Sequence, residues 1–299
     1  MPTLRDIKRR IASVKSTQQI TRAMKLVAAA RLRRAQERLV EARPYCRAMG
    51  EIVSDLALRS PRGLHPLLRA PLTNGEDATT RKLLLVISGD RGLCGAFNSN
   101  IIRRSLDLLR AEQGNPDLSL SLVVVGRKVR DFYRRSGQVT VRSEYAHLFD
   151  KLAFSHAAQI GQDVAAAYVG GEVDEVRLVY NEFRSAASQR VVVETLLPIH
   201  TAAGSGEGTA GEYLFEPSPA AILEALLPRH VEVQVYHALM ESLAAEYGAR
   251  MTAMENATKN ASEMIDLLTI QFNKARQERI TKELLEIVSG AEALRQARD

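Results

Sequence analysis

The chain has 299 residues, of which 45% are hydrophobic and 25% are charged, a composition typical of one or two globular domains. It contains no Trp and only two cysteines, Cys46 and Cys94. This excludes a disulfide framework or a thiolate metal cluster, and both thiols are expected to be free in a reducing compartment. The formal net charge of +6 is uneven, because residues 1–47 carry 13 basic and three acidic side chains. Such a segment predicts an anionic partner: nucleic acid, anionic lipid or an acidic protein surface.

Targeting and membrane segments are not expected. The start MPTLRDIKRR has no apolar stretch behind its charges, so it does not resemble a secretory signal, and it fits a structural helix better than a transit peptide. No window holds 18 consecutive apolar residues, so no membrane-spanning helix is predicted.

Residues 3–58 predict one long helix, because Gly is absent until Gly50 and helix-forming residues dominate. Apolar residues recur in steps of three and four, which indicates a coiled coil. The phase of this seam is expected to slip near Thr17, and Pro44 is expected to kink or end the helix. Residues 20–39 are apolar or small on most faces and basic on the rest. The seam comprises Leu4, Ile7, Ile11, Val14, Ala28, Leu32, Ala35, Leu39, Ala42, Cys46, Met49, Val53 and Leu56.

A change of character follows. Residues 60–80 hold three Pro and two Gly and are interpreted as a linker. Residues 81–200 alternate short apolar runs with helical patterns, which predicts a Rossmann-like α/β domain with a mostly parallel sheet, the last two strands pairing antiparallel. Residues 201–218 are interpreted as a loop. The strands are expected at 82–90, 120–128, 175–183 and 189–199, and the helices at 97–113, 127–136 and 150–169.

Residues 219–299 are assigned to a C-terminal helix, whose helical pattern runs on after Pro228 with Gly248 and Gly290 as its only interruptions. At 1.5 Å per residue its length would approach 100 Å, which is more than a globular domain of this size can hold, so this helix should project. With residues 1–59 it predicts a long antiparallel coiled coil. Its apolar end, residues 280–294, predicts a partner. The seam includes Tyr236, Leu239, Leu243, Tyr247, Met251, Met254, Ala261, Ile265, Leu268, Phe272 and Ala275.

Catalytic motifs are weak. GDRGLCGAFN follows a predicted strand and precedes a helix, as a phosphate-binding loop would, but it lacks the G-K-[ST] ending and the G-x-G-x-x-G spacing. Cys94 has no His or acid at a recognisable spacing, so it is interpreted as a buried small residue. His230 and His237 are two turns apart on one helix face, which is unsuitable for a metal. No catalytic residue, cofactor or metal site is predicted.

Four separated motifs carry a family resemblance. LRDIKRRIASVKSTQQITRAMKLVAAARLRRAQ near the start, GDRGLCGAFNSN at 89–100, EYLFEPSP at 212–219 and NKARQERITKELLEIVSGAEAL at 273–294 resemble motifs of the gamma subunit of F-type ATP synthase. They occur in order across residues 3–294, nearly the whole chain.

The resemblance implies a central rotor shaft without a catalytic site of its own. The terminal helices would turn inside a sleeve of three alpha and three beta subunits, and the α/β domain would meet the epsilon subunit and the c-ring. Ion-driven rotation of the ring would change the nucleotide affinities of the beta subunits. The protein would lie at the cytoplasmic face of a bacterial inner membrane, peripheral to it. Residues 200–216 contain no Cys, so the thiol regulation of the chloroplast form is not expected.

The resemblance also implies the contact residues. The positions that would touch the sleeve are Met24, Lys25, Arg250, Gln277 and Thr281. Tyr213 and Glu216 lie in the stretch that would meet the epsilon subunit and the c-ring.

Two other functions remain as alternatives. A basic coiled-coil scaffold or nucleic-acid-binding protein would explain the charge of the first helix, although no aromatic residue interleaves its arginines. A nucleotide-using α/β enzyme with helical arms would bind nucleotide as an isolated chain. No nucleic acid is expected among the partners of a rotor shaft.

Overall fold

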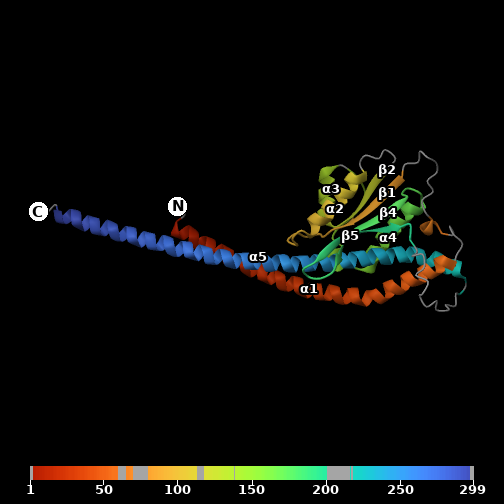
Figure 1. Ribbon diagram of the computed structural model, residues 1–299, viewed down its shortest axis with the longest axis horizontal. Helices are drawn as coiled ribbons and strands as arrows, with labels where there is room; N and C mark the ends of the chain where they lie inside the picture. The colour runs from red at the N-terminus through yellow and green to blue at the C-terminus, as the bar shows by residue number, and fades with distance from the viewer. Residues whose placement is uncertain are drawn as a thin grey trace. The chain divides into compact units, whose positions relative to one another are not determined.

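The structure is a computed structural model that describes residues 3–59, 65–69, 80–112, 118–137, 139–200, 216 and 218–296. The chain divides into two compact units. Unit 1 comprises residues 1–27 and 253–299, and unit 2 comprises residues 28–252. Two long helices belong to both units: α1 (Leu4–Arg59) and α5 (Pro219–Gln296) (Figure 1).

Unit 2 contains a five-stranded sheet in the order β3-β2-β1-β4-β5. The neighbours β3, β2, β1 and β4 are parallel, and β5 is antiparallel to β4, as predicted. In the register of the central pair, Thr80 lies opposite Leu118 and Ile87 opposite Val125. The strands are β1 (Thr80–Ile87), β2 (Leu118–Val125), β3 (Thr140–Tyr145), β4 (Glu175–Phe183) and β5 (Gln189–Leu197).

Helices cover both faces of this sheet, and accordingly β1 and β2 end in continuous apolar runs at 83–87 and 122–125. On one face, Leu84 and Val86 of β1 contact residues of α2 (Phe97–Glu112) and α3 (Arg127–Ser136). On the other face, Leu83 and Leu85 belong to a larger core with α4 (Phe154–Val169), α5 and the later part of α1. Two short 3-10 helices, Pro66–Leu68 and Phe149–Lys151, complete the described elements.

Three expectations about the helices and strands need correction. Strand β3 escapes prediction because Val141 and Tyr145 are its only large apolar residues, as suits an edge strand. Helix α1 does not end at Pro44, whose side chain is exposed, so the backbone carbonyl that loses its donor lies on the outer side of the helix. Helix α5 runs from Pro219 to Gln296 without the interruptions expected at Gly248 and Gly290.

Unit 1 is an antiparallel pair formed by α1 up to Val27 and α5 from Ala253 onward. Antiparallel pairing is evident because Lys25 contacts Glu255 while Thr21 contacts Thr258, so the sequence numbers run in opposite directions. The seam residues of α5 that belong to this unit, from Met254 to Ala275, are all buried or half-buried, which confirms the coiled coil.

The predicted slip of the seam near Thr17 is wrong. Buried or half-buried positions continue from Val14 through Gln18, Thr21 and Lys25 to Ala28 in steps of four and three. The heptad is therefore unbroken, and only its chemistry changes, because three successive seam positions are polar. A pattern search for apolar residues loses the phase at these positions.

Candidate partner-binding surface

The residues expected to touch the sleeve occupy different levels of the structure. On α1, Met24 is half-buried and Lys25 forms an ion pair with Glu255, with Nζ 2.6 Å from Oε1. On α5, Gln277 and Thr281 are exposed. They follow Glu255 by six turns or more, which is roughly 33 Å along the helix. Within unit 1 these positions therefore lie at two places along the helix axis and do not form one cluster.

Arg250 differs from the others because it is buried in unit 2. Its side chain is 11% exposed, and Nη2 lies 2.5 Å from Oε1 of Glu246. The same nitrogen donates to the carbonyl of Gly92 at 3.3 Å. Arg250 thus links α5 to the loop between β1 and α2.

Of the positions expected to meet the epsilon subunit and the c-ring, Glu216 is described and exposed. Tyr213 lies outside the described residues. The predicted linker also falls largely outside them, except for residues 65–69 and Thr80, the first residue of β1.

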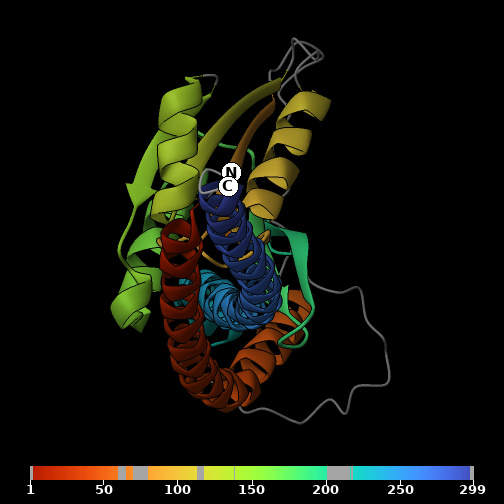
Figure 2. The same ribbon diagram turned by 90° about the vertical axis from the view of Figure 1, so that its left-hand side faces the viewer.

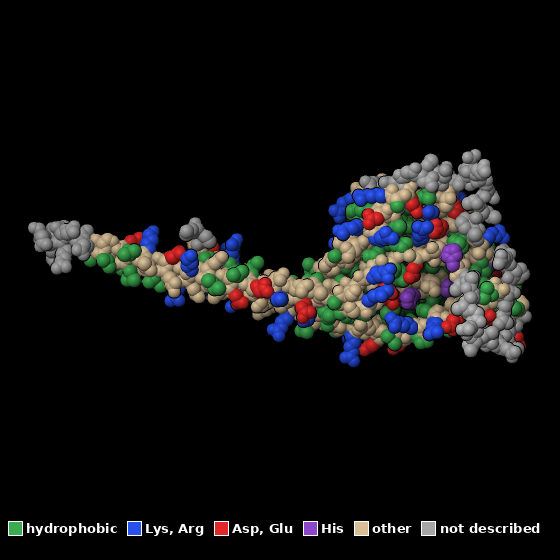
Figure 3. Space-filling view, viewed as in Figure 1, with side chains coloured by type: hydrophobic (Ala, Val, Ile, Leu, Met, Phe, Trp, Pro, Cys, Tyr) green, Lys and Arg blue, Asp and Glu red, His purple; other side chains and the backbone are tan. Residues whose placement is uncertain are grey.

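Large apolar side chains lie at the surface of unit 1 (Figure 3). On α1, Leu26 is 66% exposed, and on α5 Leu285 and Ile287 are 62% and 68% exposed. A run of this kind marks a surface that a partner covers. The exposed apolar residues near the end of α5 form what we call the apolar end surface: Ile280, Leu284, Leu285, Ile287 and Val288.

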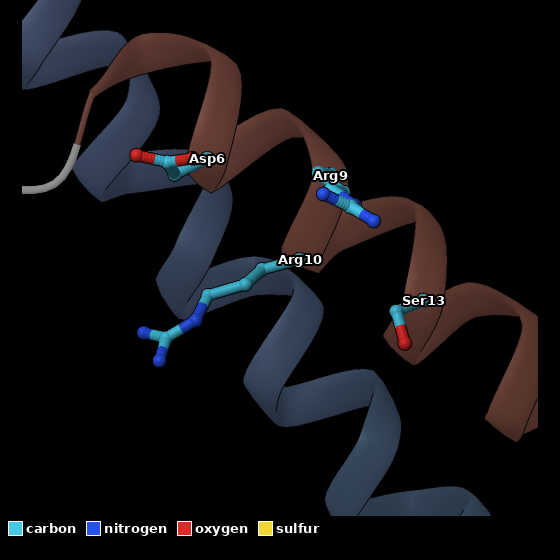
Figure 4. Close-up of a pocket in the computed structure, with 4 residues that line it drawn as sticks. All are labelled: Asp6, Arg9, Arg10 and Ser13. Atoms are coloured by element: carbon cyan, nitrogen blue, oxygen red, sulfur yellow. The ribbon is translucent and has the colours of Figure 1, made fainter.

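The first turns of α1 add charge to this unit. Thr3 caps the helix: its Oγ1 donates to Oδ2 of Asp6 at 2.6 Å, and the Asp6 amide donates back to Thr3 Oγ1 at 3.3 Å. The hydroxyl and the backbone amide of Thr3, which both donate to Oδ2 of Asp6, hold the pKa of the Asp6 carboxyl below its ordinary value. Arg9, Arg10 and Ser13 line a shallow groove beside it, and Figure 4 shows the two arginines extending in different directions.

The β1–α2 loop, residues 88–96, is occupied by internal hydrogen bonds. The amide of Arg127 donates to Oδ1 of Asp90 at 2.9 Å, the amide of Lys128 to the Gly89 carbonyl, and the amide of Val129 to Ser88 Oγ. These three amides open α3 and are the donors that a phosphate would need. The geometry therefore favours a structural turn over a nucleotide site.

Glycine is required at the start of α3. Gly126 has a φ of +96°, and a Cβ atom there would lie 2.1 Å from the carbonyl oxygen of Ser88. The backbone of Ser88 and the start of α3 thus leave no room for a side chain between them.

Cys94 is buried, and burial raises the pKa of its thiol, which makes it a poor nucleophile. Within the described residues, no group of three or more His, Cys, Asp or Glu side chains is placed to hold a metal ion. Among the same residues, no helix is long and apolar enough to cross a membrane.

Comparison with known proteins assigns the family. A sequence model described as ATP synthase matches residues 3–294. The ATP synthase gamma chain of Anaeromyxobacter sp. (strain Fw109-5) is 48% identical over 298 residues, covering 99% of this chain and all of the relative. The chain belongs to the ATP synthase gamma chain family. The gamma chain of Pelotomaculum thermopropionicum is also 48% identical, over 98% of this chain and all of the relative.

Solved ATP synthase structures share the fold. A chain of the Euglena gracilis mitochondrial ATP synthase, in an assembly of OSCP, F1 and c-ring, covers 99% of this gamma-family chain with a TM-score of 0.69 and 23% identity, and 96% of its own length is matched. A chain of the Tetrahymena thermophila mitochondrial central stalk and c-ring covers 80% with a TM-score of 0.58 and 27% identity, with 99% of its own length matched. The resemblance drawn from the four motifs is confirmed, and the nucleic-acid alternative finds no support.

Sequence reasoning missed the buried charges of unit 2. Glu232, Glu241 and Glu246 are at most 6% exposed and lie on α5 within a mostly apolar stretch. The available signal was a Glu followed by an Arg four residues later, Glu246 and Arg250, inside a run of Ala and Leu.

Proposed function

We propose that this gamma-family chain is the rotor shaft of an F-type ATP synthase. Unit 1 turns inside a sleeve of three alpha and three beta subunits, and the α/β body of unit 2 meets the epsilon subunit and the c-ring. Rotation of the ring, driven by ions, is thereby coupled to ATP synthesis or hydrolysis at the beta subunits. The observation that carries this proposal is the exposed apolar surface of unit 1 in a chain that matches the family over residues 3–294.

The chemistry of unit 1 suits a shaft. Exposed apolar side chains give contact area. Basic residues such as Arg9, Arg10 and Arg22 attract acidic loops over a long range, and this attraction varies smoothly with the angle of the shaft. A driver of conformational change must interact differently with the different states of its partner. A shaft with two unequal helices satisfies this, because each beta subunit meets a different side of it.

We assign the sleeve contacts to Met24, Lys25, Arg250, Gln277 and Thr281, and the foot contacts to Tyr213 and Glu216. Exposure of Gln277, Thr281 and Glu216 supports three of these assignments. Lys25 can exchange its Glu255 partner for an acidic side chain of the sleeve, since the Lys25 side chain is 35% exposed and that of Glu255 55%. Arg250 as a whole residue is 9% exposed, so a partner would contact only a small part of its side chain.

The shaft has no catalytic site of its own in this proposal, and the protein lies at the cytoplasmic face of the membrane as a peripheral subunit. The raised pKa of Cys94 and the internal use of the α3 amides support a non-catalytic role. Functionally, residues 1–59 and 219–299 form the shaft helices, 60–80 the linker, 81–200 the α/β body and 201–218 a loop.

Reconstitution tests the proposal. The full chain is mixed with purified alpha and beta subunits of the same organism, and native mass and ATPase rate are measured. We expect one copy per three alpha–beta pairs and sustained ATPase activity. A Leu284→Ser, Leu285→Ser variant should weaken assembly, and a Val40→Ser variant, which alters an exposed apolar residue of unit 2, serves as its control. A chain that forms no such complex and binds DNA, RNA or nucleotide alone would overturn the proposal.

A further inference from the structure

One stretch of α5 is enclosed on nearly all sides within unit 2. Within this one continuous helix, every residue from Val231 to Arg250 is buried or half-buried. Figures 1 and 2 show this part of α5 lying between α1 and the sheet. A surface helix of a globular protein normally keeps one polar face in water, whereas a helix enclosed on all sides belongs to the core.

The β1–α2 loop encloses α5 from one side. Cys94 and Phe97 pack against Ala245 and Ala249, whose small side chains allow a close approach. Earlier in the loop, a Cβ atom on Gly89 would lie 2.8 Å from the Glu246 carboxylate, so only glycine fits there without a shift.

A hydrogen bond also joins α5 to this loop, and an ion pair within α5 orients its donor. Arg250 Nη2 is held 2.5 Å from Glu246 Oε1 and donates to the Gly92 carbonyl at 3.3 Å. Glu246 is 4% exposed, and Arg250 is its cationic neighbour on the helix. The carboxylate therefore fixes the direction in which the guanidinium points, toward the loop.

The β4–β5 hairpin encloses α5 from a second side. The Phe183 amide donates to Glu241 Oε2 at 2.8 Å, and Thr252 Oγ1 donates to the Ala186 carbonyl at 2.9 Å. Gly248 lies between these two ties, where a Cβ atom would be 3.3 Å from both Ala186 Cα and Phe183 Cε2.

Helix α1 completes the enclosure, because Leu32 and Ala35 pack against Ala244, with Tyr247 and Met251 beside them. Successive residues of an α-helix are rotated by about 100°. The residues that meet the loop, the hairpin and α1 therefore fall on three different sides of α5. We call this enclosure, formed by residues 88–97, 183–186 and 32–35 around residues 241–252, the collar.

Apolar contacts with alanine resist separation of two surfaces but allow sliding, because dispersion attraction has no direction. Hydrogen bonds with fixed partners resist rotation of the helix about its axis. The collar has three such ties, at Glu241, Arg250 and Thr252, within about three turns.

We propose that the collar is the joint through which torque passes between the α/β body and α5, and that Glu246 is a positioning residue that holds Arg250 on the Gly92 carbonyl. This rests on the proposed rotor function. Arg250 then acts from within the chain, in addition to any contact with the sleeve.

The test uses the F1Fo holoenzyme in vesicles, assembled with wild-type chain, Glu246→Gln or the control Glu51→Gln. The control removes an exposed carboxylate that pairs with Arg47 in the same i,i+4 spacing. We expect Glu246→Gln to assemble and hydrolyse ATP near the wild-type rate while gradient-driven ATP synthesis falls several-fold. The control should keep both activities. Unchanged synthesis in Glu246→Gln would overturn the collar proposal.

A second variant separates torque transfer from folding. Glu246→Gln with Arg250→Met replaces the buried pair by groups of similar size without a charge, which is often neutral for stability. We expect a melting temperature near that of the wild type together with the same loss of synthesis; full synthesis in this variant would also overturn the proposal. Failure of the wild-type chain to join alpha and beta subunits would instead contradict the rotor function itself.

Discussion

Two sections of the same helix have opposite surface chemistry. In unit 2, the section of α5 from Val231 to Arg250 buries three glutamates and an arginine. In unit 1, the section after Met254 exposes leucine, isoleucine and valine along much of its length. Buried charges persist in the first section because backbone amides, amide side chains and guanidinium groups bind them. The second section keeps its apolar groups in water, which indicates a surface completed by another protein.

The largest expected difference between the two sections concerns leucine. Leu239 is fully buried in the core of unit 2, so Leu239→Ala should lower the free energy of unfolding by about 2–5 kcal/mol. Leu284 is 57% exposed, so Leu284→Ala should change it by less than about 0.5 kcal/mol. Urea denaturation of the isolated chain measures both. Equal losses would show that the end of α5 is covered within the chain.

Glycine gives a second matched pair. Gly248→Ala should destabilise the chain by about 1–3 kcal/mol, because the new Cβ atom lies 3.3 Å from the β4–β5 hairpin and forces it to move. Gly290 has no atom within 4 Å of a Cβ position, so Gly290→Ala should stabilise the helix by about 0.5–1 kcal/mol. Circular dichroism at increasing temperature would report both, and a loss at Gly290 would contradict the exposed surroundings described for it.

A half-buried histidine just before the enclosed stretch of α5 predicts a pH effect on stability. Burial lowers the pKa of His230 below its ordinary value of 6.5, and its Nδ1 atom is buried with no hydrogen-bond partner. Below about pH 6.5 the unfolded chain binds this proton more readily than the folded one, so stability falls as the pH drops through this window. His230→Phe should reduce this slope. Urea midpoints of both chains from pH 7.5 to pH 5 measure it, and parallel curves would contradict the assignment.

The smallest effect is expected at the polar seam of unit 1. The single hydroxyl hydrogen of Thr258 has two acceptors within reach, Thr21 Oγ1 at 2.8 Å and the Met254 carbonyl at 2.7 Å. Thr21→Val leaves Thr258 with that second acceptor, so stability should change by no more than about 1 kcal/mol. The structural consequence is larger, because a polar seam position selects one register. Spin-label distances between α1 and α5 should broaden in the variant and stay narrow in the conservative Thr21→Ser.

Much of this architecture follows from the sequence, and the failures have physical reasons. The seam from Met254 to Ala275 is predicted because apolar residues recur at regular helical spacing over many turns. The central strands are predicted because each contains a run of apolar residues. Pro44 misleads, since a proline in a helix costs less than the tertiary contacts of α1 provide. The collar could not be predicted, because it joins Gly89, Ala186 and Glu246, which only the fold brings together.

The hydrogen bonds around Asp90 have a wider consequence. In many sheets of this type the strand ends hold a dissociable anion at a helix N-terminus, and its occupancy follows the concentration in solution. Here the chain supplies the anion itself, because the Asp90 carboxylate accepts the amides of Arg127 and His147. A tethered group competes at a very high effective concentration, so free phosphate cannot readily replace it. The shape of this edge is therefore insulated from cellular ATP and ADP levels, which change continuously around a protein that works among nucleotides.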